Sequence, residues 1–209
     1  MIHALKPLWI FLKRDITILF QNYKLVWIPF FSMLLSLGLL GYLVPDIIQN
    51  YGNEIFLFFL FLAIANQESG FSEDEESGYF EVLRLTSSLR PFYFSSKLLS
   101  LVLFWITAAL PVAALILKQM DLIVCLRLFL FITGTTAVLL ILSLLIPRSS
   151  LFSGLMILFG LPLFLPLLIL ANSSLITPTT EVTIAFGFYT SLCGAIYGLI
   201  ALKTGSIDH

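Results

Sequence analysis

The side chains that could do chemistry in this chain are few, and the densest group of them lies in residues 70–97. Five of the 12 acidic residues of the protein belong to this stretch: Glu73, Asp74, Glu75, Glu76 and Glu81. Ser72 followed by Glu75 fits a capping box, and the helix dipole stabilises acidic side chains in a first helical turn. The pattern predicts a short amphipathic helix over residues 72–89, ended by Pro91.

A short acidic helix between two apolar segments has two interpretations. The acidic side chains can simply keep a loop solvated. Alternatively, a soluble partner can grip the helix and move the flanking segments as a lever. The docking interpretation assigns the partner contacts to Asp74, Glu75, Glu76, Gly78, Glu81 and Arg84.

One further charge, Arg127, lies well inside an apolar run. A long arginine side chain in a membrane helix can extend to the membrane surface. It can also pair with a haem propionate or with a buried carboxylate of another subunit, because charges inside a membrane are usually paired. The sequence leaves both roles open.

Residue types that support catalysis or cofactor binding are scarce. His3 and His209 stand at the two ends of the chain, so axial haem ligation within an apolar segment is not indicated. The sequence contains neither a GxxxxGKS/T phosphate-binding loop nor an HExxH motif. Cys125 and Cys193 lie in apolar runs and fit small core residues. We therefore expect a chain that is not an enzyme and holds no metal or cofactor itself.

The elements that must position these residues are strongly apolar. Hydrophobic residues make up 59% of the 209 residues and charged residues only 11%, whereas soluble domains carry about 25% charged residues. The net charge of −1 gives no indication of a nucleic-acid partner. The composition predicts one all-α integral-membrane domain over residues 1–209.

Spanning helices are indicated by segments of about 20 mostly apolar residues. Six are predicted, two within residues 26–67 and four within residues 98–203: 26–44, 53–67, 98–117, 122–146, 151–171 and 182–202. The docking segment, residues 68–97, joins the second span to the third. Pro111, Pro162 and Pro166 predict kinks, because proline removes a backbone donor.

Residues 1–24 predict a helix of another kind. Apolar side chains recur there at helical spacing, and Lys6, Lys13 and Lys24 share another face. A basic amphipathic helix of this type lies in the membrane interface, and Trp9 suits headgroup depth.

The basic residues also predict the orientation. With the N-terminus inside, nine of the 11 Lys and Arg residues fall on the inner side: Lys6, Lys13, Arg14, Lys24, Arg84, Arg90, Lys97, Arg148 and Lys203. This orientation places the docking segment inside, in a bacterial inner membrane or a mitochondrial inner membrane.

A family resemblance follows from the acidic run. Residues 74–81, DEESGYFE, resemble the D-x-E-x-G-x-x-E element of the haem exporter B family (cytochrome c maturation protein B), whose members are membrane subunits of ABC-type complexes. Six more segments resemble family elements in the family's order: Lys13-Arg14-Asp15, Lys97, Leu110-Pro111, Gly134-Thr135, Arg148 and residues 161–166. The chain departs from the family where Thr136 replaces a proline, where Ser149-Ser150 replaces part of a basic run, where Pro91 is displaced and where the third span lacks a histidine.

The resemblance implies a permease-like fold of the ABC-2 type and a role in cytochrome c maturation. It implies an A-type ATPase partner that supplies ATP hydrolysis, a C-type membrane subunit that handles haem, and a small D-type subunit and haem chaperone. Two alternatives stay open: an ABC-2-type permease for another substrate, and a membrane scaffold that transports nothing.

Overall fold

The described part of the chain is helical throughout its regular structure. The computed structural model describes residues 6–21, 31, 74, 86–116, 122–145, 162–170 and 180–203. Its elements are α1 (Lys6–Gln21), the 3-10 helix η3 (Ser87–Leu89), α7 (Arg90–Ile116), α8 (Leu122–Leu145) and α10 (Thr180–Lys203), with a further helical stretch at 162–170. The predicted all-α class is therefore confirmed for these residues. The first predicted span apart from residue 31, the second predicted span, and residues 68–73 and 75–85 of the docking segment lie outside them.

Among the described residues, two helices are long and apolar enough to cross a membrane. They are Cys125–Leu145 within α8 and Thr180–Lys203, which is α10. The fourth and sixth predicted spans coincide with these helices to within about three residues at each end. Charges at the ends of α10 suit its dipole, since Glu181 is in its first turn and Lys203 in its last.

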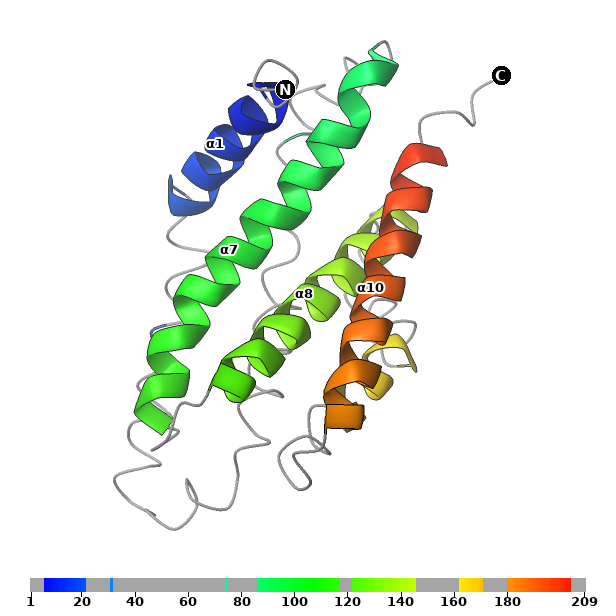
Figure 1. The fold of residues 1–209 in the computed structure, drawn as a ribbon. Coiled ribbons are helices and arrows are strands. Elements are labelled where there is room, and N and C mark those ends of the chain that lie inside the picture. The colour runs from blue at the N-terminus through cyan, green and yellow to red at the C-terminus, as the bar shows by residue number, and fades with distance from the viewer. Residues whose placement is uncertain are drawn as a thin grey trace, which may run out of the picture.

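The helices lie side by side, as Figure 1 shows, with α1 along the first half of α7 and α8 against α10. Ring contacts give the direction of α1. Phe11 packs edge-on against Tyr93 at a centroid distance of 6.0 Å, and Phe20 packs against Phe104 at 6.2 Å. Both helices therefore run in the same direction, and α1 follows α7 over about three turns.

The core joins all four long helices. Phe11 of α1, Tyr93 of α7, Leu140 of α8 and Tyr197 of α10 belong to one buried cluster. The Tyr197 hydroxyl donates to the backbone carbonyl of Phe94 at 3.0 Å, which satisfies a polar group between α10 and α7.

A glycine sets the closest approach between helices in the second half of the chain. A Cβ atom at Gly134 of α8 would lie 2.7 Å from Leu167 Cδ2 and 3.3 Å from Thr190 Oγ1. Leu167 is fully buried, so it has little room to move. A side chain at position 134 would therefore push α8 away from residues 162–170 and from α10.

The prolines lie within or at the start of helical stretches. Pro91, predicted to end the docking helix, lies in the first turn of α7, where a missing backbone donor costs little. Pro111 is inside α7, Pro166 is inside the stretch 162–170, and Pro162 is its first described residue. The kinks predicted at the last three positions stay predictions.

Candidate functional site

The candidate site begins with a carboxylate on the apolar face of α1. The buried residues of this helix are Phe11, Leu12, Asp15 and Leu19, which share one face at helical spacing. Asp15 is only 2% exposed. Burying a charge is costly unless it is paired, so this position requires cations from a neighbouring element.

Helix α7 supplies such a partner from the face that packs on α1. Tyr93, Ser96, Lys97 and Ser100 are all buried, and their spacing of three or four residues places them along one side of the helix. Lys97 is 6% exposed. The buried face of α1 thus carries a negative charge and the buried face of α7 a positive one, and the two faces meet where α1 packs on α7.

Four charged side chains form a buried ion-pair network, which we define as Arg14, Asp15, Asp74 and Lys97. Lys97 Nζ lies 3.2 Å from Asp15 Oδ1 and 2.6 Å from Asp74 Oδ2. Arg14 Nη2 lies 2.9 Å from Asp15 Oδ1 and 2.7 Å from Asp74 Oδ1. Each cation thus bridges both carboxylates, and the two positive charges balance the two negative ones.

Neutral donors complete the network. The Tyr93 hydroxyl donates to Asp74 Oδ2 at 2.7 Å, and the Ser96 hydroxyl lies 2.9 Å from Asp15 Oδ2. All four carboxylate oxygens therefore have a donor within hydrogen-bond distance. Burial raises the pKa of Tyr93 well above its ordinary value, and the negative charge of Asp74 and the hydrogen bond to it raise this pKa further. Tyr93 stays a donor at any working pH.

The network joins three parts of the chain that are distant in sequence. Arg14 and Asp74 are 60 residues apart, and Asp15 and Ser96 are 81 residues apart. Removing one member of a buried pair leaves an uncompensated charge, which is strongly destabilising. This arrangement is suited to holding Asp74, α1 and α7 together, so that displacement of one part is resisted by the other two.

The predicted docking residues divide into one described residue and five undescribed ones. Asp74 is 3% exposed, and both of its carboxylate oxygens bind donors within the chain. Its side chain therefore faces inward, where it can anchor the acidic stretch. Glu75, Glu76, Gly78, Glu81 and Arg84 lie outside the described residues, and their docking role stays a prediction.

Arg127 lies in the second turn of α8, toward the end of the helix group opposite the ion-pair network. It is 3% exposed, and its Nη2 and Nε atoms lie 3.2 Å and 3.3 Å from Thr183 Oγ1 of α10. The guanidinium thus links the two helices that are apolar enough to span a membrane. A contact with haem or with another subunit stays a prediction.

Tyr93 and Ser96 were not predicted as site residues. Tyr93 and Ser96 precede Lys97 at positions that share one face of α7. This spacing identifies them only once it is known that this face packs on α1. In the part of the chain that the structure describes, no group of three or more His, Cys, Asp and Glu side chains is placed to hold a metal ion.

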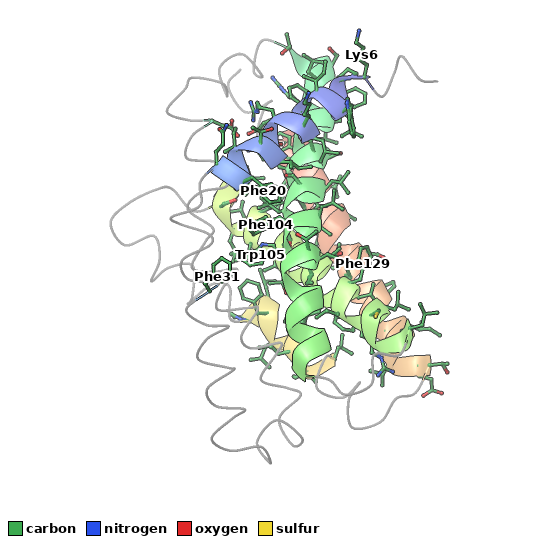
Figure 2. The ribbon with its side chains drawn as sticks, turned by 90° about the vertical axis from the view of Figure 1, so that its left-hand side faces the viewer. Lys6, Phe20, Phe31, Phe104, Trp105 and Phe129 are labelled. Atoms are coloured by element: carbon green, nitrogen blue, oxygen red, sulfur yellow. The ribbon has the colours of Figure 1, made fainter. Side chains whose placement is uncertain are left out.

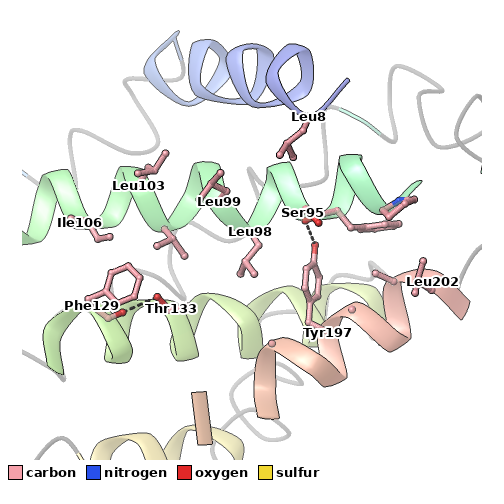
Figure 3. Close-up of a pocket in the computed structure, with 16 residues that line it drawn as sticks. Leu8, Ser95, Leu98, Leu99, Leu103, Ile106, Phe129, Thr133, Tyr197 and Leu202 are labelled. Carbon is pink, nitrogen blue, oxygen red and sulfur yellow. Dashed lines mark hydrogen bonds between the residues drawn. The ribbon is translucent and has the colours of Figure 1, made fainter. Parts of the chain in front are cut away.

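An apolar groove of about 570 Å³ lies along α7 on the side facing α8 and α10. Figure 3 shows Leu98, Leu99 and Tyr197 among the side chains that line it, with Phe129 toward one end and Leu202 toward the other. Its lining is almost entirely hydrocarbon, so it has the character of a helix-packing or lipid-facing surface.

The resemblance drawn from sequence motifs has no counterpart in the comparisons with known proteins. No family model, no curated protein and no solved structure matches the chain.

Proposed function

We propose that this chain is the membrane subunit of an ABC complex for cytochrome c maturation. In this role it couples ATP hydrolysis by an A-type partner to the handling of haem or a haem-loaded chaperone, with C-type and D-type membrane subunits beside it. The proposal rests on the sequence resemblance to the haem exporter B family. Two structural observations support it.

The first observation is the convergence of three separate family-like elements. Arg14 and Asp15 come from the first element, Asp74 opens the acidic element, and Lys97 is the lysine before the third predicted span. These residues form the buried ion-pair network, with N–O distances of 2.6–3.2 Å. Elements that resemble those of a family in their order along the sequence, and that also meet in space, support one shared structural role.

A second meeting point supports the same idea. Gly134 belongs to the Gly-Thr element, and Leu167 directly follows the element at residues 161–166. These two residues pack so closely that a Cβ atom at Gly134 would lie 2.7 Å from Leu167 Cδ2. A residue of one later family-like element therefore packs against the residue that follows another.

The mechanism that follows is mechanical. A soluble ATPase grips the docking helix predicted within residues 72–89, where Thr86 is not helical and Ser87–Leu89 form η3, and displaces it during its nucleotide cycle. Asp74 is tied by ion pairs to α1 and α7, so the displacement is passed to α7, which leads into the third span.

We infer six spanning helices with the N-terminus inside, in a bacterial or mitochondrial inner membrane. The distribution of charge over the described helices supports this orientation. Figure 1 shows that α1 and α7 begin, and α10 ends, toward one end of the helix group. The residues at those helix ends are Lys6, Arg90 and Lys203. All three are basic, as expected for the inner side of a membrane.

Purification in mild detergent, with identification of the proteins that accompany the chain, tests the proposal. We expect a small ATPase and a haem-handling membrane protein. The double charge reversal Glu76→Lys and Glu81→Lys should lose the ATPase while the chain stays folded. The matched control Glu181→Lys, an exposed acid at the start of α10, should retain it. An ATPase that still accompanies the double variant would refute the docking role.

A further inference from the structure

The face of α1 that points away from α7 carries large apolar side chains next to cations. Trp9, Ile10 and Phe20 are 66%, 56% and 53% exposed. Lys6 and Lys13 are also exposed. Figure 2 shows Lys6 projecting from the start of α1 and Phe20 at its far end, beside Phe104. A water-soluble helix would place polar side chains at these apolar positions.

Among the described residues, the charged side chains that α1 places on this face are all positive. Asp15 is the only acidic residue in the sequence of α1, and it is buried on the opposite face in the ion-pair network. Arg14, whose side chain is 28% exposed, reaches from the network to the outer face. The surface therefore complements a negatively charged partner.

A shallow groove of about 600 Å³ lies on this face. Its lining combines cations, an indole ring, a hydroxyl group and aliphatic carbon: Trp9, Ile10, Lys13, Arg14, Thr17, Ile18 and Gln21. Cations beside exposed indole and aliphatic groups are the features of a helix surface that binds anionic lipid.

The contacts of α1 also indicate its depth in a membrane. Lys97 is the last charged residue of α7, since residues 98–116 contain none. A charge at the end of an apolar stretch marks the headgroup level. Asp15 Oδ1 lies 3.2 Å from Lys97 Nζ, so the middle of α1 is at this level. Phe20 contacts Phe104, which lies about two helical turns beyond Lys97 in the apolar stretch of α7.

We propose that this groove binds the phosphate headgroup of an anionic phospholipid, with Lys13 pairing with the phosphate and Trp9 beside it on the same face of α1. In the proposed membrane placement this groove faces the surface of the bilayer, so the ligand is a lipid of the surrounding membrane. This inference rests on the membrane placement within the proposed function, and not on the ATPase or haem part of it.

The test uses quenching of Trp9 fluorescence by brominated lipid in vesicles that contain the full chain. The chain has three tryptophans, and the difference between the wild type and Trp9→Phe isolates the signal of Trp9. We expect brominated phosphatidylglycerol to quench Trp9 more strongly than brominated phosphatidylcholine. Lys13→Gln should weaken this preference about five-fold, as expected for one cation near an anionic surface. Lys203→Gln, an exposed lysine at the end of α10, is the matched control and should leave it unchanged.

Three results would contradict the inference, and they have different meanings. Equal quenching by both lipids would refute the headgroup preference while leaving the membrane placement intact. No quenching of Trp9 by either lipid would refute the membrane placement of α1 as well. Loss of the preference on adding inorganic phosphate at the headgroup concentration would identify a site for free phosphate. Arg14 is not used as the test variant, because its loss would also break the ion-pair network.

Discussion

Replacing Lys97 by methionine tests the ion-pair network most sharply. Lys97 Nζ lies 2.6 Å from Asp74 Oδ2, and both side chains are less than a tenth exposed. At an effective dielectric constant of about 20, this pair alone has a gross attraction of about 6 kcal/mol. Desolvation of the charges offsets much of that energy in the wild type. Methionine keeps the length and the apolar stem of the side chain, so the variant removes the charge with little change in packing.

The free energy of unfolding should fall by about 3–5 kcal/mol in Lys97→Met, because two buried carboxylates are left with one cation. Asp74→Asn should also destabilise the chain, because two cations then share one carboxylate. The double variant leaves Arg14 and Asp15 as a balanced pair. Its loss should therefore be smaller than the summed losses by about 0.5–3 kcal/mol, the range measured for residues in direct contact.

The assay is denaturant unfolding of the purified chain in detergent, followed by far-ultraviolet circular dichroism. Lys203→Met is the control, because it removes an exposed lysine and should change the free energy of unfolding by less than about 0.5 kcal/mol. Additive losses in the double variant, or a loss in Lys97→Met no larger than in the control, would refute the network as a structural tie.

Two other predictions concern α7 and α8. Tyr93→Phe should lower the free energy of unfolding by about 1.5–3 kcal/mol at neutral pH, because it removes a hydrogen bond to a buried carboxylate. Because the pKa of Tyr93 is higher in the folded chain than in the unfolded chain, its contribution to stability is complete below a pH of about 10 and is lost at higher pH. The free energy of unfolding of the wild type should therefore approach that of the variant in alkaline titrations. Plots of this free energy against pH that stay parallel for the two proteins would contradict the prediction. Gly134→Val should cost about 1–3 kcal/mol through overpacking against Leu167, measured by thermal unfolding in detergent. Gly198→Val, where a Cβ atom meets open space, should cost less, and equal losses would refute the close helix contact.

The helices that could be predicted from sequence are those with long apolar runs. Residues 122–146 were predicted as a span and α8 covers Leu122–Leu145. Residues 182–202 were predicted and α10 covers Thr180–Lys203. Their near-uniform apolar character fixes length and type without reference to neighbours, which is why boundaries agree so closely.

The start of α7 could not be predicted in the same way. The third span was expected at residues 98–117, but the helix begins at Arg90. Arg90 and Lys97 interrupt the apolar pattern and make the segment look like a loop. In the folded chain Lys97 is buried and paired with Asp15 and Asp74. Its charge interrupts the apolar pattern in the sequence, but the ion pairs allow it to lie within the helix.

The candidate site was only partly accessible to sequence analysis. Asp74 was singled out as a docking residue because it lies in an acidic run, and the same run gives no sign that one member faces inward. Its partners, Arg14 and Lys97, are 60 and 23 positions away along the chain. Periodicity identifies the buried face of each helix, but which two faces meet is decided by tertiary packing.

The most direct test of the proposed function is the amount of haem covalently attached to c-type cytochromes in cells that lack this chain. Our account predicts that attached haem is lost in the deletion strain and restored by the wild-type chain. The Lys97→Met variant should restore less of it than the Lys203→Met control. Unchanged haem attachment in the deletion strain would contradict the assignment to cytochrome c maturation.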